Sequence, residues 1–191
     1  MANINGPFGL RPVRHLHGAT IVQNAYTIAS GYASNIFIGD PVMQTGTGNN
    51  IQLAVGTAGT PTVNGCGVFA GCFFTDATGK PTFSKYWPSG TVASDAVALV
   101  WDDPQIIFEA QSLLFALDDI GALVDFTAAA GNTKTGLSGS YLDSTTGTTG
   151  KTFRLLRLVP RPDNAVGAYA KVEVLYVEHA LLGVVSGVGG V

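Results

Sequence analysis

The stretch from Gly65 to Gln111 constrains the fold most, because it concentrates large apolar side chains in short runs separated by turns. It holds both tryptophans, both cysteines and five of the ten phenylalanines. Bulky aromatic side chains supply much of the buried area of a core. The runs are rich in Val, Phe and Thr and are punctuated by Gly, Pro and Asp, which is typical of β-strands joined by turns. The stretch therefore predicts three or four successive strands.

The same pattern continues on both sides of this stretch. Strands are predicted at 21–29, 41–44, 51–55, 65–75, 82–86, 92–101, 105–111, 152–159 and 169–179. About nine short strands with turn signals between them predict an all-β protein, either a small β-barrel or a β-sandwich of the jelly-roll or β-tulip kind. Leu113 to Asp125 is the best helix candidate, so at most one short helix is expected. Residues 131–150, rich in Gly, Ser and Thr, are expected to be mostly loop.

Two of these strands carry finer signals. Gly67 and Gly71 lie inside a strand, which indicates a β-bulge or the close approach of another backbone. In the strand 169–179, apolar residues alternate with Lys171 and Glu173. This period of two predicts that one face of that strand contacts water.

Length and composition indicate one domain with a large contact surface. The chain has 191 residues, and only 12% of them are charged. An ordinary soluble domain carries about 25% charged residues. We expect an extended N-terminal arm (1–20), a single β domain (21–182) and a Gly/Val tail (183–191) that frays or contacts a neighbour.

The first twenty residues have no helical or strand period, since prolines and glycines interrupt them. They nevertheless carry the apolar residues Ile4, Phe8, Leu10, Val13 and Leu16. A disordered tail is usually poorer in such residues. We expect an arm laid along another surface; a flexible terminus and an arm folded back on its own domain remain the alternatives.

The charges are segregated along the chain. The net charge is −3, so nucleic acid is not an expected partner. Between Lys85 and Lys134 every charged residue is acidic, whereas residues 151–171 hold five bases and one acid. Such blocks either pair across subunits or form separate solvated faces.

Cysteine usage and hydropathy give expectations about the compartment. Cys66 and Cys72 lie on one predicted strand at a separation of about 20 Å, beyond disulfide reach. Two buried free thiols fit a reducing compartment. The opening residues have no apolar core of a signal peptide, and no run reaches the ~18 apolar residues of a membrane span, so neither is expected.

Few residues suggest chemistry. His15 and His17 are spaced as two metal ligands, but the third histidine, His179, is distant in sequence. The pairs Asp102/Asp103 and Asp118/Asp119 have the composition of a hydrolytic carboxylate pair but also that of turn and cap residues. We therefore predict no catalytic, cofactor or metal site and expect that the protein is not an enzyme.

Tyr86 and Trp87 are adjacent aromatic residues beside a proline. They are consistent with a platform for stacking sugars, or with packing at a turn or an interface.

Seven pieces of the chain, in order, resemble the capsid decoration (cement) proteins of tailed bacteriophages. They are PFGLRPVRH (7–15), YTIASGYASNIFIGDPV (26–42), GVFAGCFFTDATGK (67–80), YWPSGT (86–91), DDPQIIFEAQ (102–111), RPDNAVG (161–167) and KVEVLYVEH (171–179). The resemblance implies a small β-barrel or β-sandwich bound to the outside of an assembled capsid, at junctions between major capsid protein subunits. It also implies self-association as a dimer or trimer, and it carries over no catalytic residue.

We therefore expect a virion structural protein that stabilises the capsid against internal DNA pressure. It would be made in the host cytoplasm, reside on the outer capsid surface, and bind neither nucleic acid nor membrane. The expected capsid-binding residues are Phe8, Leu10, Arg11, Val13 and Arg14. The expected subunit contacts are Tyr86, Trp87, Asp102, Asp103, Arg157 and Arg161. The alternatives are another virion subunit (tail tube or head–tail joining) and a carbohydrate-binding module.

Overall fold

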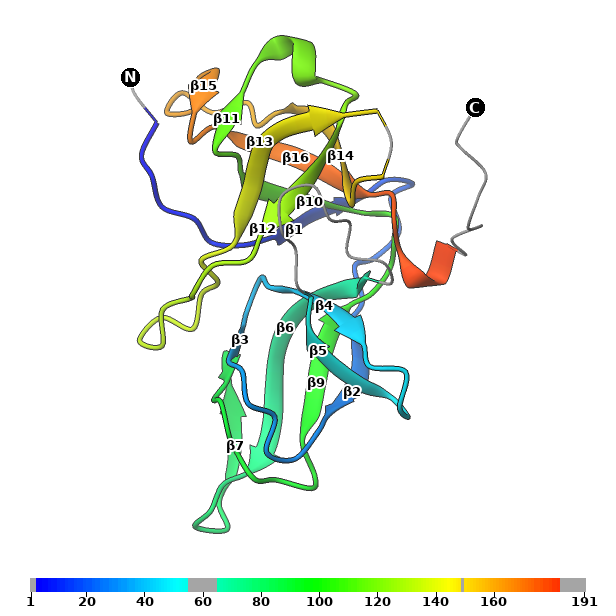
Figure 1. Cartoon of the computed structure of the whole chain (residues 1–191), viewed down its shortest axis with the longest axis vertical. Helices are drawn as coiled ribbons and strands as arrows, with labels where there is room; N and C mark the ends of the chain where they lie inside the picture. Colours follow the sequence, from blue (N-terminus) through cyan, green and yellow to red (C-terminus); the bar gives the residue numbers. More distant parts are fainter. Residues whose placement is uncertain (1–2, 55–64, 149, 183–191) are drawn as a thin grey trace.

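Sixteen short strands form the described part of this computed structural model, residues 3–54, 65–148 and 150–182. The all-β prediction is confirmed, because 47% of the residues lie in strands and five strands close into a barrel. The helical elements of these residues are two short 3₁₀ turns, η1 (Leu117–Asp119) and η2 (Ala180–Leu182). Two β-rich halves are stacked along the long axis of the molecule (Figure 1).

The lower half is the closed barrel. Its strands run in the order β4 (Pro41–Gln44), β5 (Asn50–Leu53), β2 (Asn24–Ile28), β9 (Val97–Trp101) and β6 (Gly65–Thr75), and β6 pairs again with β4. The β2–β5 pairing is parallel, and the other pairings are antiparallel. Two accessory pairings involve β6 with β7 (Pro81–Ser84), and β3 (Ile36–Phe37) with β8 (Tyr86–Trp87).

The upper half is a curled antiparallel sheet. Its order is β1 (Arg11–His15), β10 (Ile106–Gln111), β16 (Lys171–Tyr176), β14 (Phe153–Leu158), β12 (Leu123–Thr127) and β13 (Tyr141–Gly147). The sheet bends back on itself, since the Leu113 N–H after β10 donates to the Leu142 carbonyl of β13 at 2.9 Å. A short ribbon of β11 (Leu114–Phe115) and β15 (Gly167–Ala168) lies at its upper end (Figure 1).

Each half has its own hydrophobic core. The barrel encloses Trp87, Phe69 and Val100, whereas the upper sheet packs around Phe108 and Phe153. The predicted single domain at 21–182 therefore contains two cores. The segregation follows from the alternation of strand side chains, because each sheet closes around its own inward-facing set.

Hydrogen bonds from the loop between β12 and β13 of the upper sheet join the two halves. The Ile38 N–H donates to the Gly136 carbonyl, and the Ser138 N–H donates to the Ile38 carbonyl, both at 3.0 Å. The buried Asp40 carboxylate accepts hydrogen bonds from the hydroxyls of Ser138 and Ser140. Burial raises the pKa of Asp40 although these hydrogen bonds oppose the shift.

Most predicted strands are present, but the helix prediction is wrong. Residues 113–125 instead form β11, η1 and the start of β12. Gly121 interrupts the segment with a φ of +88°, and Val124 and Phe126 then enter the upper core from an extended backbone. The prediction of loop across 131–150 missed β13, whose Ser/Thr-rich sequence belongs to an edge strand. The predicted Gly/Val tail lies outside the described residues.

The glycine signals in β6 are confirmed. Gly67 has a φ of +143°, and a Cβ built there would lie 2.3 Å from the Trp101 carbonyl oxygen of β9. The register between β6 and β9 shifts between Phe69 and Gly71, which marks a bulge. These glycines let β6 bend around the barrel while it stays paired on both sides.

Gly67→Ala should destabilise the protein by about 3 kcal/mol, because the methyl group clashes with backbone and the backbone conformation disfavours an L side chain. Gly6→Ala is the matched control, since no atom lies within 4 Å of its Cβ position. Urea unfolding of both variants measures the difference, and equal midpoints would contradict the close approach at Gly67.

Candidate functional site

The N-terminal segment belongs to the upper sheet. Residues 11–15 form the edge strand β1, in which Arg11 is opposite Glu109 and His15 is opposite Ile106. Leu10 is only 3% exposed and lies in the upper core. The prediction of an arm laid on another surface is therefore wrong, and the alternative of a segment folded back on its own chain is correct. Leu10 is not an exposed anchor, because its side chain is buried in the upper core at the base of a surface groove. Strand pairing and apolar burial offset the entropy cost of ordering the segment.

Residues preceding β1 are also held to the chain. The Asn3 side chain donates to the Ala165 carbonyl at 2.8 Å and accepts from the Ala165 N–H at 2.9 Å. The Gln111 side chain accepts from the Gly6 N–H and donates to Asn5, both at 2.9 Å. These contacts lay residues 3–10 along the upper half (Figure 1).

A row of four charged residues crosses the upper sheet at one register. Arg11 of β1, Glu109 of β10, Glu173 of β16 and Arg157 of β14 are directly opposed in that order. Two glutamates thus face each other on neighbouring strands, an arrangement that is unfavourable unless cations neutralise it.

Each glutamate binds two arginines. Glu109 Oε2 lies 2.8 Å from Arg11 Nη2 and 2.7 Å from Arg161 Nη2. Glu173 lies 3.0 Å from Arg14 Nη2 through Oε2 and 2.8 Å from Arg157 Nη2 through Oε1. We call these four arginines and the two glutamates beneath them the four-arginine face.

The carboxylates of the four-arginine face are buried, whereas its guanidinium groups contact water. The glutamate side chains are at most 4% exposed, and the arginine side chains are 39–55% exposed. Burial disfavours ionisation of Glu173, but hydrogen bonds from Arg157 and Arg14 outweigh it and lower the Glu173 pKa. The face therefore places two buried carboxylates, each paired with two arginines, under four cations.

This arrangement changes two expectations from the sequence. The acidic and basic blocks pair inside one chain, as in Arg161–Glu109 and in the buried pair Lys151–Asp125, so these pairs are not available across subunits. Glu173 lies on the predicted wet face of its strand but is buried, because Arg14 and Arg157 cover it.

An apolar groove borders the four-arginine face. Its volume is about 290 Å³, and it is lined by Phe8, Leu10, Arg11, Pro12, Ile38, Gly39, Trp101 and Leu137. The Arg11 guanidinium carbon lies 4.9 Å from the centre of the Phe8 ring. Arg11 therefore belongs to both the groove and the four-arginine face.

The structure rules out some of the predicted subunit contacts. Trp87 is fully buried, with its ring 5.3 Å from that of Phe74, and Tyr86 stacks on Phe37 at 5.3 Å. Trp87 is therefore part of the barrel core. The predictions that it stacks against sugars or anchors a subunit interface are wrong. Asp102 is likewise buried, so its contact role is corrected too.

Asp102 and Asp103 have different local partners. Asp102 accepts hydrogen bonds from the Asn24 amide and the Tyr26 hydroxyl at 2.9 Å, and burial raises the Tyr26 pKa. Asp103 lies 3.0 Å from His15 Nε2. His15 Nδ1 accepts the backbone N–H groups of His17 and Ala19, so this ring stabilises the turn after β1.

No group of three or more His, Cys, Asp or Glu side chains in the described residues is placed to hold a metal ion. Cys66 and Cys72 are unpaired and buried, as predicted. Burial raises the pKa of each thiol to about 12, which leaves both protonated at neutral pH. Among the described residues, no helix has the length and apolar character needed to span a bilayer.

A second pocket, of about 420 Å³, lies where the two halves meet. It is lined mainly by small side chains around residues 33–35 and 128–131, with Asp40 at its wall. The Asp40 carboxylate already accepts hydrogen bonds from the Ser138 and Ser140 hydroxyls and from the Phe37 N–H. Asp40 therefore joins the two halves.

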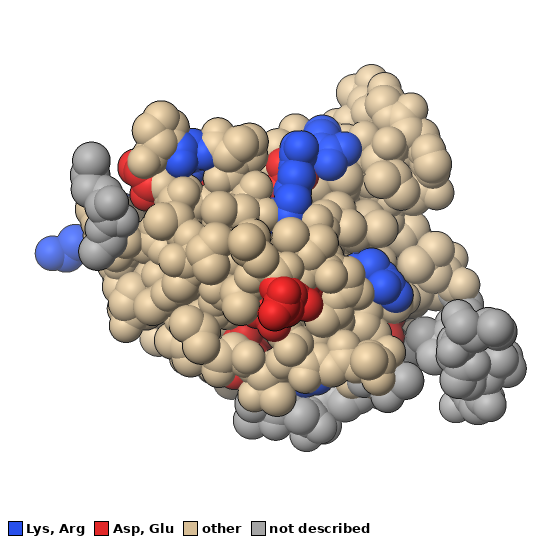
Figure 2. Space-filling view, turned by 90° about the horizontal axis from the view of Figure 1, so that it is seen from above, with Lys and Arg blue, Asp and Glu red and all other residues tan. Residues whose placement is uncertain are grey.

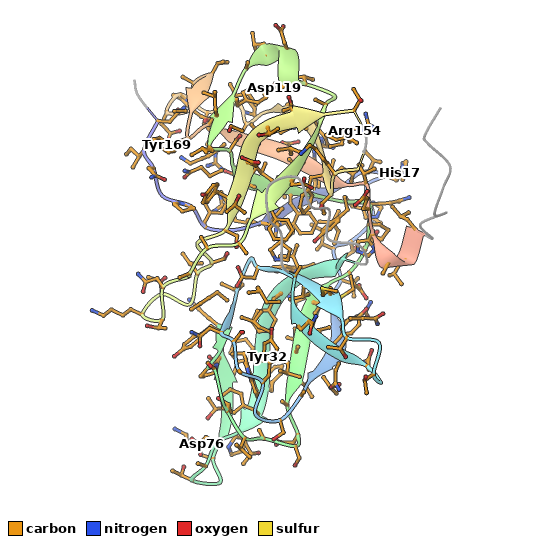
Figure 3. All side chains as sticks on the ribbon, viewed as in Figure 1. His17, Tyr32, Asp76, Asp119, Arg154 and Tyr169 are labelled. Atoms are coloured by element: carbon orange, nitrogen blue, oxygen red, sulfur yellow. The ribbon has the colours of Figure 1, made fainter. Side chains whose placement is uncertain are left out.

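Charged groups are sparse on the face seen from above (Figure 2). Apolar side chains are exposed at both ends of the molecule. Phe73 and Phe83 pack together in the β6–β7 hairpin with ring centres 4.8 Å apart, and Leu117 and Ile120 are about half exposed in and beside η1. Asp76 and Asp119 mark these two opposite ends (Figure 3).

In comparisons with known proteins, no family model, no curated protein and no solved structure matches the chain.

Leu10→Ala should lower the free energy of unfolding by about 2–4 kcal/mol, because it leaves a cavity in the upper core. Ile4→Ala removes a side chain that is 81% exposed and should change stability by less than about 0.5 kcal/mol. Chemical denaturation compares them. Equal stability of both variants would mean that the N-terminal segment is not packed on the sheet.

His179 should make the protein acid-sensitive. Burial lowers its pKa from the ordinary 6.5 to about 4, although Asp102 and Asp103 oppose the shift. Protonation therefore favours the unfolded chain, and about 3 kcal/mol of stability should be lost as pH falls from 6.5 to 4.

Unfolding measured from pH 7 to pH 4 tests this expectation. His179→Asn should flatten the pH dependence across that window, whereas His17→Asn, which replaces an exposed ring, should leave it unchanged. If His179→Asn lost stability between pH 7 and pH 4 as steeply as the unchanged protein, His179 would not be the source of the acid sensitivity.

Proposed function

We propose that the protein is a virion structural protein that binds the outer surface of an assembled phage capsid, at junctions between major capsid protein subunits. In this role it stabilises the shell against the pressure of packaged DNA. Two observations support the proposal. Seven pieces of the sequence, in order, resemble capsid decoration proteins, and the all-β fold agrees with the fold that this resemblance implies.

One observation carries the proposal further. The piece PFGLRPVRH, residues 7–15, supplies four of the eight residues that line the apolar groove and two cations of the four-arginine face. Val13 in the same strand is 46% exposed. Apolar side chains flanked by arginine are typical of protein interfaces. The segment that resembles decoration proteins thus also carries contact chemistry.

The shape of the molecule suits a bridging role. Two β halves joined through buried hydrogen bonds form an elongated body, with exposed apolar side chains at each end (Figure 3). A body that contacts more than one subunit gains avidity, because the second contact is effectively intramolecular. Many copies on one shell then stabilise it without any single strong contact.

Binding to capsids tests the proposal. The purified protein should co-sediment with expanded capsids that lack it, and reach a fixed copy number per capsid measured by gel stoichiometry. Absence of binding, or assembly of the protein alone into rings or tubes, would contradict a decoration role.

Val13→Asn should weaken capsid binding at least about tenfold, since a polar side chain in an interface core costs about 1.4 kcal/mol or more. Val92→Asn is the control, because Val92 is 77% exposed in the lower half, away from β1. Equal binding of the two variants would move the contact surface away from β1 while leaving the decoration role in place.

A further inference from the structure

We propose that the four-arginine face is a docking site for carboxylate groups on an acidic patch of a partner protein, with the apolar groove beside it taking a neighbouring apolar side chain. This inference rests on the proposed function, in which the partner is the capsid surface.

The spare hydrogen-bonding capacity of the four arginines supports the inference. A guanidinium group has five N–H donors. In the described residues, Arg11, Arg14, Arg157 and Arg161 each donate one side-chain hydrogen bond, to a buried glutamate. The other donors lie on side chains that are about half exposed. These free donors can form bidentate hydrogen bonds with a carboxylate, the geometry that Arg favours.

Stability alone does not account for this cluster. A buried ion pair is often no more stable than apolar residues of similar volume. Here two opposed glutamates anchor four long side chains at fixed points: Arg11 and Arg14 on β1, Arg157 on β14, and Arg161 in the loop that follows β14. Anchoring reduces the side-chain entropy lost on binding, so the cluster presents cations that are already ordered.

The charge balance favours an acidic protein over nucleic acid. The face carries four cations and two carboxylates, whereas the whole chain has a net charge of −3, so the remainder is acidic. Duplex DNA presents about one negative charge every 1.7 Å and would meet this acidic remainder. A local acidic patch matches a local cationic one.

The groove defines the second half of the site. Arg11 forms part of its lining, and the remaining lining is apolar apart from backbone atoms. A partner segment with an apolar side chain next to carboxylates would fill the groove and reach Arg11 and Arg14 together. Apolar contact supplies affinity, and charge complementarity sets the orientation and the association rate.

The double variant Arg11→Gln/Arg14→Gln tests the site. It leaves Arg161 on Glu109 and Arg157 on Glu173, so each buried carboxylate keeps one cation. The control Lys134→Gln/Arg154→Gln removes the same charge from exposed residues outside the face. Thermal unfolding establishes that both proteins are folded.

Capsid co-sedimentation is then measured at low and high salt. We expect the double variant to bind at least about tenfold more weakly at low salt and to lose most of the salt dependence, because screening acts on exposed charges. The control should stay within about twofold of the unchanged protein.

The outcomes separate the two proposals. Equal binding of the double variant and the control would overturn the docking site but not the decoration role. Failure of the unchanged protein to bind capsids would overturn the decoration role. If the double variant lost affinity for duplex DNA and bound capsids normally, the face would be a nucleic-acid site, and the assignment to an acidic protein would be wrong.

Discussion

The upper half depends on the pairing of β1 with β10. This pairing brings Arg11 and Arg14 over two buried glutamates that face each other and that would otherwise have one arginine each. The same strand follows Leu10, which enters the upper core and donates a 2.8 Å backbone hydrogen bond to Gly39 of the lower half. Residues 3–15 therefore complete a sheet, neutralise its charges and join the two halves. Removing them would expose the edge of β10 and leave Glu109 and Glu173 with one arginine each.

The charge arrangement also explains how so sparsely charged a chain can present a defined binding surface. The surface carries few charges. What distinguishes the four arginines is that buried glutamates hold their side chains in fixed positions. Strand register sets the positions of Arg11, Arg14 and Arg157, and the buried carboxylates hold these three arginines and Arg161 of the loop after β14. Binding at such a surface loses little side-chain entropy. The adjoining groove adds apolar contact at the same place.

Much of the fold was predictable from local sequence. The bounds of β4 and β6 match the predicted strands, since Gly, Pro and Asn turns delimit them. The helix at 113–125 was predicted wrongly because a short apolar run is compatible with either period, and only the upper core decides which residues must point inward. Glu109 was missed as a site residue, although an acid inside the apolar run IIFEAQ is a usable signal that a buried partner is needed. Trp87 looked available for contact because its burial comes from strands distant in sequence.

The sequence by itself determined the all-β class, the turns and the free buried cysteines, because these follow from side-chain type and spacing along a few residues. Tertiary structure alone decided that the strands divide into two cores, that the N-terminal segment is a strand and not a free arm, and that the acidic and basic blocks pair within one chain. These features depend on contacts between residues distant in sequence, such as Arg11 with Glu109, 98 positions apart, and Arg14 with Glu173, 159 positions apart. No local pattern encodes such pairings, because strand register is fixed only when the sheets close.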